Sequence, residues 1–331
     1  MLRVDQVNDG ARPIVGYEAL YGLLSWDRSV SRALVHRSSV HEVLLTDART
    51  LGDGRVAVGV QFPRWHAVSA GGAQEVVADT LAIEAVRQIG LMLSHTEMGV
   101  PLDAVFLAHE LGFRRSSTPV SVADAVIDAV AVATVERQGR GRQAAFVLRV
   151  ELVVGDEVVG TGLGRMTCVS PVVYRRLRGT PRMASSALAP VSRPSAVLPP
   201  MVARQLERQV VVTVAPRDAR STGDDDRRSA AFASPHAVET FLLVDPSNPF
   251  YFDHPYDHAP GTLLLEAMQQ TAVLATGRPT AGARAEFARY VELGDDVVLS
   301  APRVVGERAD RSPVTITQGG AVVANGVVYL D

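Results

Sequence analysis

The chain has 331 residues, of which 47% are hydrophobic and 21% charged, an ordinary balance for a globular protein. Its formal net charge of -3 gives no reason to expect nucleic acid or an anionic membrane as the main partner. The single cysteine, Cys168, excludes an internal disulfide and a cysteine-based metal site. No apolar run reaches the length of a membrane span or follows a basic leader, so we expect a cytoplasmic protein.

The first predicted elements follow an N-terminal extension over residues 1–30. A short apolar strand, "EVLLTD", ends at Asp47 and leads into the loop "FPRWHAVSA". The helical stretch "DTLAIEAVRQIGLML" comes next, and then "AFVLRVELVVGDEVVGTGLGRMTCV", whose apolar residues alternate as in strands. Its Gly155-Asp156 step is a hairpin signal. We expect a first repeat over residues 31–171.

Residues 172–205 are rich in Pro, Ser, Ala and Arg and have no sustained period. This composition is typical of a linker lying on a surface, and we expect its arginines to be solvated. A second breaker, "RDARSTGDDDRR" (217–228), reads as an exposed loop. The linker divides the chain into two halves, and the second repeat is expected over residues 206–331.

The second half repeats the order of the first. It contains the strand "TFLLVD", the loop "NPFYFDHPYDH", the helix "GTLLLEAMQQTAVLA", and the period-two segments "ARYVELGDDVVLSAPRVV" and "PVTITQGGAVVANGVVYL". A helix this apolar needs cover on most sides, which a curved antiparallel sheet supplies. The pattern predicts an α+β double hotdog: two tandem hotdog units, each a curved antiparallel sheet wrapped around a long apolar helix, paired edge to edge as an intrachain pseudo-dimer. The alternative is two unrelated α+β domains.

Each predicted helix carries one glutamate followed by polar residues at i+3 and i+4, which lie on the same face. The two groups are Glu84, Arg87 and Gln88, and Glu266, Gln269 and Gln270. Desolvation raises the pKa of a carboxylate toward the range of a general base. We therefore expect Glu266 as the catalytic base, with Glu84 second. The alternative is that both groups hydrogen-bond backbone or a partner helix and fix the docking of the repeats.

The helices begin at Asp79-Thr80 and Pro260-Gly261, and the first backbone N–H groups of a helix have no intrahelical acceptors. We expect such a start, Gly261 in particular, to hold an oxyanion or a thioester carbonyl.

The loop before the second helix contains two Asp-His pairs. His254 is a candidate catalytic acid or base and His258 a substrate-binding residue, while Asp253 and Asp257 are expected to hold an imidazole tautomer. The alternative is a turn with exposed histidines. A further alternative is a metal site formed by His254, Asp257 and His258, but such loops more often only turn, and we expect no metal.

Three further residues complete the candidates. His66 in "PRWH" is the weaker first-half counterpart of these histidines. His95 lies well down the first helix, where a satisfied structural histidine is expected, and Cys168 reads as a small buried hydrophobe.

Two stretches resemble known families. "DHPYDHAPGTLLLEAMQQ" is similar to the loop-and-helix signature of 3-hydroxyacyl-carrier-protein dehydratases, although the spacing from His to Glu is two residues shorter. "VHRSSVHEVLLTD", "FPRWH" and "DTLAIEAVRQIGLMLSHTEMGVPLDAVFLAHELGF" resemble the A-factor synthase (AfsA) family of actinobacterial signal biosynthesis. The second resemblance covers nearly the whole chain, and that family is described as a tandem hotdog.

The AfsA resemblance implies an acyltransferase. It would move a 3-oxoacyl group from acyl carrier protein to a hydroxyl of dihydroxyacetone phosphate, on the way to a butenolide and a gamma-butyrolactone autoregulator. The phosphopantetheine thioester would be a substrate, and no cofactor is expected. A bound alcohol that is deprotonated beside a thioester needs no enzyme nucleophile.

The chain departs from the family pattern at Gln269, where the motif has an arginine. We expect the second half to supply the base and Arg87 of the first half to reach across the interface to a phosphate, bidentate as arginine prefers. The further substrate-binding candidates are Gln88, Gln269, Gln270, Asp257 and His66. Two other functions stay open: a hotdog dehydratase or thioesterase, and a non-catalytic regulator. Both a monomeric pseudo-dimer and a homodimer are compatible with the sequence.

Overall fold

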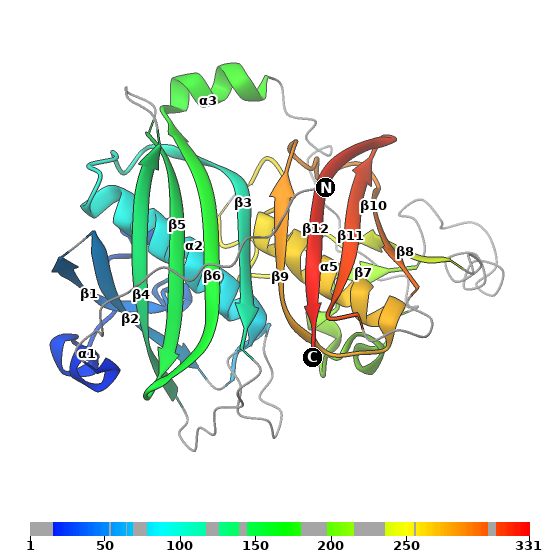
Figure 1. Ribbon diagram of the computed structural model, residues 1–331. Coiled ribbons are helices and arrows are strands. Elements are labelled where there is room, and N and C mark those ends of the chain that lie inside the picture. Colours follow the sequence, from blue (N-terminus) through cyan, green and yellow to red (C-terminus); the bar gives the residue numbers. More distant parts are fainter. Residues whose placement is uncertain are drawn as a thin grey trace.

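The structure is a computed structural model that describes residues 16–52, 54–63, 65–68, 78–116, 126–138, 144–179, 197–214, 236–254, 256–303 and 309–331. Its strands form one sheet with the order β1-β2-β4-β5-β6-β3-β9-β12-β11-β10-β8-β7, and every neighbouring pair is antiparallel. Figure 1 shows the two halves side by side, each with one long helix against its part of the sheet. The predicted double hotdog is confirmed.

The first half contributes six strands of this sheet. They are β1 (Leu45–Gly52), β2 (Arg55–Pro63), β3 (Val105–Arg115), β4 (Val126–Gln138), β5 (Ala144–Val154) and β6 (Glu157–Val169). The predicted hairpin joins β5 to β6, with Gly155 at a positive φ of 60°. Cys168 is buried in β6, as expected.

The second half contributes the other six. They are β7 (Val212–Thr213), β8 (Ala237–Leu242), β9 (Thr280–Phe287), β10 (Val297–Pro302), β11 (Arg311–Gln318) and β12 (Ala321–Leu330). The predicted Gly-Gly turn joins β11 to β12, and both glycines have positive φ, which glycine adopts without steric cost.

The long helices are α2 (Asp79–Thr96) and α5 (Gly261–Thr276), close to the predicted bounds. Nearly every residue of each helix is buried, because the curved sheet covers one side and the other helix and the loops cover the rest. Burial of each leucine contributes about 1.5–3 kcal/mol, so these apolar helices anchor a shared core. Among the described residues, no helix is both long and apolar enough to cross a membrane.

The halves meet where β3 pairs with β9, from Glu110 opposite Glu286 to Arg114 opposite Gly282. Gly282 has a φ of 113°, and a Cβ there would overlap the carbonyl of Phe113, so this close approach requires glycine. Arg284 and Glu110 form an ion pair across the junction. The two repeats of the predicted pseudo-dimer are therefore joined edge to edge by main-chain hydrogen bonds between β3 and β9.

A pair of short 3₁₀ helices precedes the first strand of each half. They are η1 (Arg32–Val35) and η2 (Val40–Glu42), and η3 (Pro199–Val202) and η4 (Glu207–Gln209). The residue after the first 3₁₀ helix has a left-handed backbone in both halves, His36 with φ 50° and Ala203 with φ 53°. These segments are thus structural equivalents, and an arginine follows in each, Arg37 and Arg204.

The predicted alignment of the two opening strands is wrong. β1 begins at Leu45 rather than ending at Asp47, and its equivalent is the two-residue β7, not "TFLLVD". "TFLLVD" overlaps β8, the equivalent of β2. A strand as short as β7 has no readable period, which explains the error.

Two helices lie outside the repeats' cores. α1 (Tyr17–Leu23), in the N-terminal extension, packs Leu20 on the outer face of β2 and β4. α3 (Pro171–Arg178) follows β6 and occupies the first described part of the expected linker. Figure 1 shows α3 above the sheet at the upper ends of β5 and β6. The second breaker, 217–228, lies outside the described residues. The domain boundaries stay predictions.

Candidate active site

A cavity of about 310 Å³ lies between the halves. The first half lines it with residues of α2, β3 and β6, and the second half with the loop before α5, the start of α5 and the segment after β9. The polar lining residues are Arg37, Arg87, His109, Tyr251, Tyr256, His258, Thr262, Arg289 and Tyr290. The remaining walls are largely apolar, so the cavity suits a ligand with an acyl chain and a polar end.

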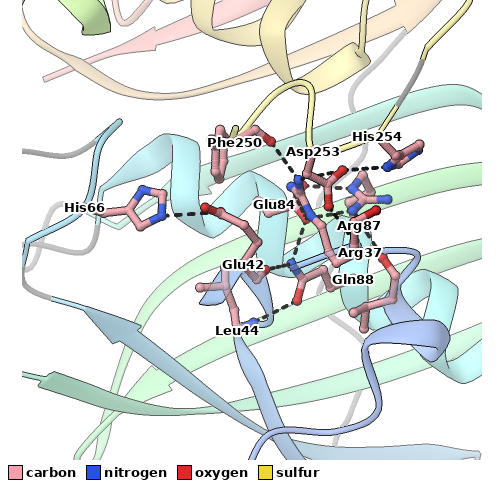
Figure 2. A network of polar contacts seen from close by, with 12 residues as sticks. Arg37, Glu42, Leu44, His66, Glu84, Arg87, Gln88, Phe250, Asp253 and His254 are labelled. Carbon is pink, nitrogen blue, oxygen red and sulfur yellow. Dashed lines mark hydrogen bonds and ion pairs between the residues drawn. The ribbon is translucent and has the colours of Figure 1, made fainter. Parts of the chain in front are cut away.

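Glu84 lies behind this cavity, fully buried and surrounded by hydrogen-bond donors (Figure 2). Arg87 donates from Nε to Oε2 and from Nη2 to Oε1, both at 2.8 Å. Arg37 donates from Nε at 3.1 Å, and its Nη2 lies 2.7 Å from Oε1. The amide of Gln88 donates at 2.7 Å. Glu84 is therefore an ion-pair centre, and Arg37 and Arg87 separate it from the cavity.

The expected rise in the pKa of Glu84 is wrong. Burial alone would raise this pKa, but the charges of Arg37 and Arg87 and the hydrogen bonds from Arg87 and Gln88 outweigh burial and lower it to about 2. A lowered pKa makes Glu84 a weaker base than an ordinary carboxylate, and its catalytic role stays a prediction.

Glu266 is the centre of an equivalent cluster in the second half. Arg204 donates to its Oε1 at 2.7 Å, Gln270 donates to the same oxygen at 2.6 Å, and the hydroxyl of Thr80 donates to Oε2. Burial would raise the pKa of Glu266, but Arg204 and these hydrogen bonds lower it instead. Arg87 lines the cavity and Glu266 does not, so the proposal that Glu266 acts as the base beside a phosphate held by Arg87 gains no support from this geometry and stays a prediction.

Gln88 and Gln270 hold the segments before the first strands. The Gln88 amide donates to Glu42 O at 2.7 Å and accepts from Leu44 N at 2.9 Å. Gln270 does the same with Gln209 O at 2.6 Å and Val211 N at 2.9 Å. Each glutamine is thus bonded to backbone of its own half, and neither lines the cavity. A role of the two polar groups in docking the repeats stays a prediction.

The sequence did not identify Arg37 as a partner of Glu84, and the prediction that Arg204 is solvated is wrong. The arginines of the linker were expected to be solvated, yet Arg204 pairs with Glu266, and the Arg178 side chain is only 5% exposed. A signal was present, since "VHR" (35–37) and "VAR" (202–204) stand the same distance before Leu44 and Val211. This similarity was not recognised, because the residues around Arg204 have the composition of a linker.

His258 lines the cavity, and Asp257 holds its ring. His258 Nδ1 lies 2.5 Å from Asp257 Oδ1, so in the neutral ring Nδ1 carries the proton and Nε2 has a lone pair. Tyr174 donates to both oxygens of Asp257 at 2.9 and 2.8 Å, and Arg178 Nε donates at 3.1 Å. Burial would raise the pKa of Asp257, but the hydrogen bonds from His258 and Tyr174 and the charge of Arg178 hold it well below its usual range. His258 is thus an oriented acceptor at the cavity wall.

His254 forms the second predicted Asp-His pair, with Nδ1 2.6 Å from Asp253 Oδ1. Its ring lies against Tyr256, at 4.1 Å between centroids, and it does not line the cavity. Asp253 accepts from Ser38 N at 2.8 Å and lies 3.6 Å from Arg37 Nη1. This pair therefore ties the loop to the first half, as Figure 2 shows.

The start of α5 faces the cavity through Pro260, Gly261 and Thr262. Its N-cap, Pro260, provides no side-chain acceptor, so the first N–H groups of the helix are available to an oxygen of a ligand. Gly261 is the first residue of α5 and lines the cavity, and its role in binding an oxyanion or a thioester carbonyl stays a prediction.

The equivalent start of α2 is closed instead. Asp79 lies 3.2 Å from Arg115 Nε, and Arg115 also donates to Asp331 at 2.7 Å. Thr280 donates to Gln269 at 3.0 Å, next to this ion pair. Arg87 in α2 and Gln269 in α5 occupy equivalent positions in the two halves. Protein side chains fill the space beside Gln269, whereas the space beside Arg87 is the open cavity.

Of the three described arginines that line the cavity, Arg37 donates to Glu84 and Phe250 O, and the other two have donors left for a ligand. Arg87 uses Nε and Nη2 for Glu84 and Val35 O, and its Nη1 donates to no described residue. Arg289 is exposed at the cavity rim and forms no ion pair within the described part of the chain.

Two other histidines lie away from the cavity lining. His66 lies 3.4 Å from Glu42 and packs edge-on against Phe250. His95 is a satisfied structural histidine, as expected, because Nδ1 contacts Val100 O at 2.8 Å and Nε2 lies 3.0 Å from His36 Nε2.

The A-factor biosynthesis hotdog domain (AfsA) model matches residues 23–170 and 189–330. The 2-oxo-3-(phosphooxy)propyl 3-oxoalkanoate synthase of Streptomyces virginiae is 33% identical over 293 residues, covering 86% of this chain and 90% of that protein. The synthase of the same name from Streptomyces coelicolor is 30% identical, covering 89% of each. A crystal structure of a putative oleoyl thioesterase from Lactobacillus plantarum aligns with a TM-score of 0.45 at 11% identity, covering 85% of this chain and 98% of that one.

Proposed function

Because the chain belongs to the A-factor biosynthesis hotdog family, we propose that it is an acyltransferase that esterifies a hydroxyl of dihydroxyacetone phosphate with a 3-oxoacyl group. The name of the relatives describes that ester. The observation that carries the proposal is the open cavity, in which an Asp-oriented histidine, a helix start and a guanidinium group converge.

His258 replaces the glutamates as the proposed base. Its Nε2 removes the proton of the acceptor hydroxyl, and Asp257 stabilises the imidazolium that forms. The oxygen attacks the thioester carbonyl, the new C–O bond forms, and the C–S bond then breaks. The proton on His258 passes to the leaving thiolate, so no enzyme nucleophile is needed.

The oxyanion formed during attack is assigned to the N–H groups at Gly261 and Thr262, where the helix dipole also favours negative charge. Arg87 Nη1 is assigned to the 3-oxo oxygen of the acyl group. Glu84 then has a positioning role, since its two hydrogen bonds with Arg87 fix the guanidinium plane.

The phosphate of the acceptor is assigned to Arg289, the exposed cavity residue whose guanidinium forms no ion pair within the described segments. This assignment removes the difficulty raised by Gln269, because Arg289 of the same half, rather than the residue at position 269, holds the phosphate. The acyl donor is an acyl carrier protein thioester, and one chain supplies both halves of the site.

The test is to incubate the protein with a 3-oxoacyl carrier protein and dihydroxyacetone phosphate and to measure products by mass spectrometry. A phosphorylated 3-oxoacyl ester is expected. Dihydroxyacetone, which lacks the phosphate, is the matched acceptor and should react more slowly. Free acid without any ester would indicate a thioesterase, and enoyl product from a 3-hydroxyacyl donor would indicate a dehydratase; either result would replace the proposal.

A further inference from the structure

α3 is held at the rim of the cavity by one of its faces. Tyr174 and Arg178 are four residues apart and so share a side of the helix. Arg178 donates to Glu292 at 2.7 Å as well as to Asp257, and its guanidinium lies 4.8 Å from the centre of the Tyr290 ring. Since Tyr290 lines the cavity, α3 contacts the cavity wall directly.

The exposed residues of α3 are apolar or basic. Val172 is 51% exposed and Leu177 is 60% exposed, although single apolar residues on a surface are ordinary. Arg175 and Arg176 are exposed beside them, and neither has an ion-pair partner in the described part of the chain. α3 contains no acidic residue, so this face combines apolar contact area with two free positive charges.

The charge of the patch contrasts with that of the whole protein. The formal net charge of the chain is -3, so an acidic macromolecule is repelled by the molecule as a whole and attracted at this place. Local attraction of this kind determines where on the surface a partner binds and in which orientation. The patch also lies close to the cavity, because Arg178 of the same helix stacks on Tyr290 of the cavity wall.

We propose that the outer face of α3, formed by Val172, Arg175, Arg176 and Leu177, is the docking surface for the acidic acyl carrier protein that delivers the thioester. The inference rests on the proposed function, because it assumes a carrier-bound donor. The arginines pair with carboxylates of the carrier, and Val172 and Leu177 add apolar contact area.

The test compares two donors for the double variant Arg175→Glu/Arg176→Glu. One donor is the 3-oxoacyl carrier protein, and the other is the same acyl group on N-acetylcysteamine, which has no protein surface. We expect kcat/KM with the carrier protein to fall roughly tenfold or more, and the salt dependence of that rate to weaken, because rim charges act on association. The rate with the small thioester should be unchanged.

The control is Arg28→Glu/Arg149→Glu, which makes the same change in charge at two exposed arginines outside α3 and the cavity lining. This variant should keep the wild-type rate with both donors. Equal rates of the α3 variant and wild type with the carrier protein would overturn the docking surface, as would binding of α3 to anionic phospholipid vesicles with no effect on carrier turnover. Failure of the wild-type protein with both donors would instead overturn the proposed function.

Discussion

His258 and His254 look alike in sequence, since each follows an aspartate that contacts its Nδ1. Only His258 lines the cavity. We therefore expect His258→Ala to lower kcat by roughly 10²- to 10⁴-fold, the range for loss of a general base. His254→Ala is the matched variant and should keep most of the activity. Steady-state kinetics check this, and an active His258→Ala enzyme would remove the histidine from the mechanism.

The buried glutamates give a second prediction at the residue scale. Glu266→Gln leaves the Arg204 guanidinium without its carboxylate, so the free energy of unfolding should fall by about 3–5 kcal/mol. Specific activity of the protein that remains folded should be kept. Denaturant unfolding and kinetics on the same samples separate the two effects. A stable but inactive variant would restore Glu266 as the base.

Asp79 gives a prediction about pH. Burial raises the pKa of Asp79 from 3.8 to about 6, against the opposing charge of Arg115. A carboxyl group whose folded pKa is raised stabilises the fold below its ordinary pKa, and that contribution is lost as the pH rises through the folded value. Asp79→Asn should therefore gain in stability relative to wild type between about pH 4 and pH 6. Urea unfolding across this range is the measurement, and a stability difference that does not change with pH would contradict it.

The site was predictable residue by residue only where the partners lie near in sequence. The Asp-His contacts and the glutamate stripes follow from spacing alone. Arg37 and Arg204 reach their glutamates from 47 and 62 residues away, and no spacing rule predicts such contacts. The direction of the glutamate pKa shifts depends on those arginines, so burial alone gave the wrong sign.

At the scale of elements, α3 depends on Arg178. Arg178→Ala removes the ion pairs to Asp257 and Glu292, and the helix should then open more often. We expect faster hydrogen exchange of the amides in residues 171–178 and a lower kcat, since Asp257 orients His258. Arg176→Ala, in the same helix, is the control and should leave exchange unchanged. Equal exchange in both variants would show that other contacts hold α3.

The two long helices could be predicted from the sequence, whereas the strand β9 could not. α2 and α5 have long apolar stretches that no surface segment would carry, and their bounds were predicted closely. β9 was not predicted, because "TAGARAEF" alternates small and charged residues instead of large apolar ones. Its position beside β3 gives it pairing on both sides, so tertiary context rather than propensity makes it a strand.

For the whole molecule, the main prediction concerns the difference between the two halves. Arg87→Gln makes the open position resemble its closed equivalent at Gln269, and we expect kcat/KM to fall roughly 100-fold through loss of a preorganised donor. Gln269→Ala should leave turnover nearly unchanged, because Gln269 contacts Thr280 beside a filled site. Comparable losses in both variants would mean that both positions take part.

The junction of β3 with β9 is built mainly from main-chain hydrogen bonds, which tolerate most changes of side chain outside the close approach at Gly282. A duplicated gene that keeps this joint can accumulate substitutions in one copy without disturbing how the copies are aligned. Evolution could thus specialise one end of the molecule for chemistry and the other for rigidity, while descendants of a single ancestral module remained in register.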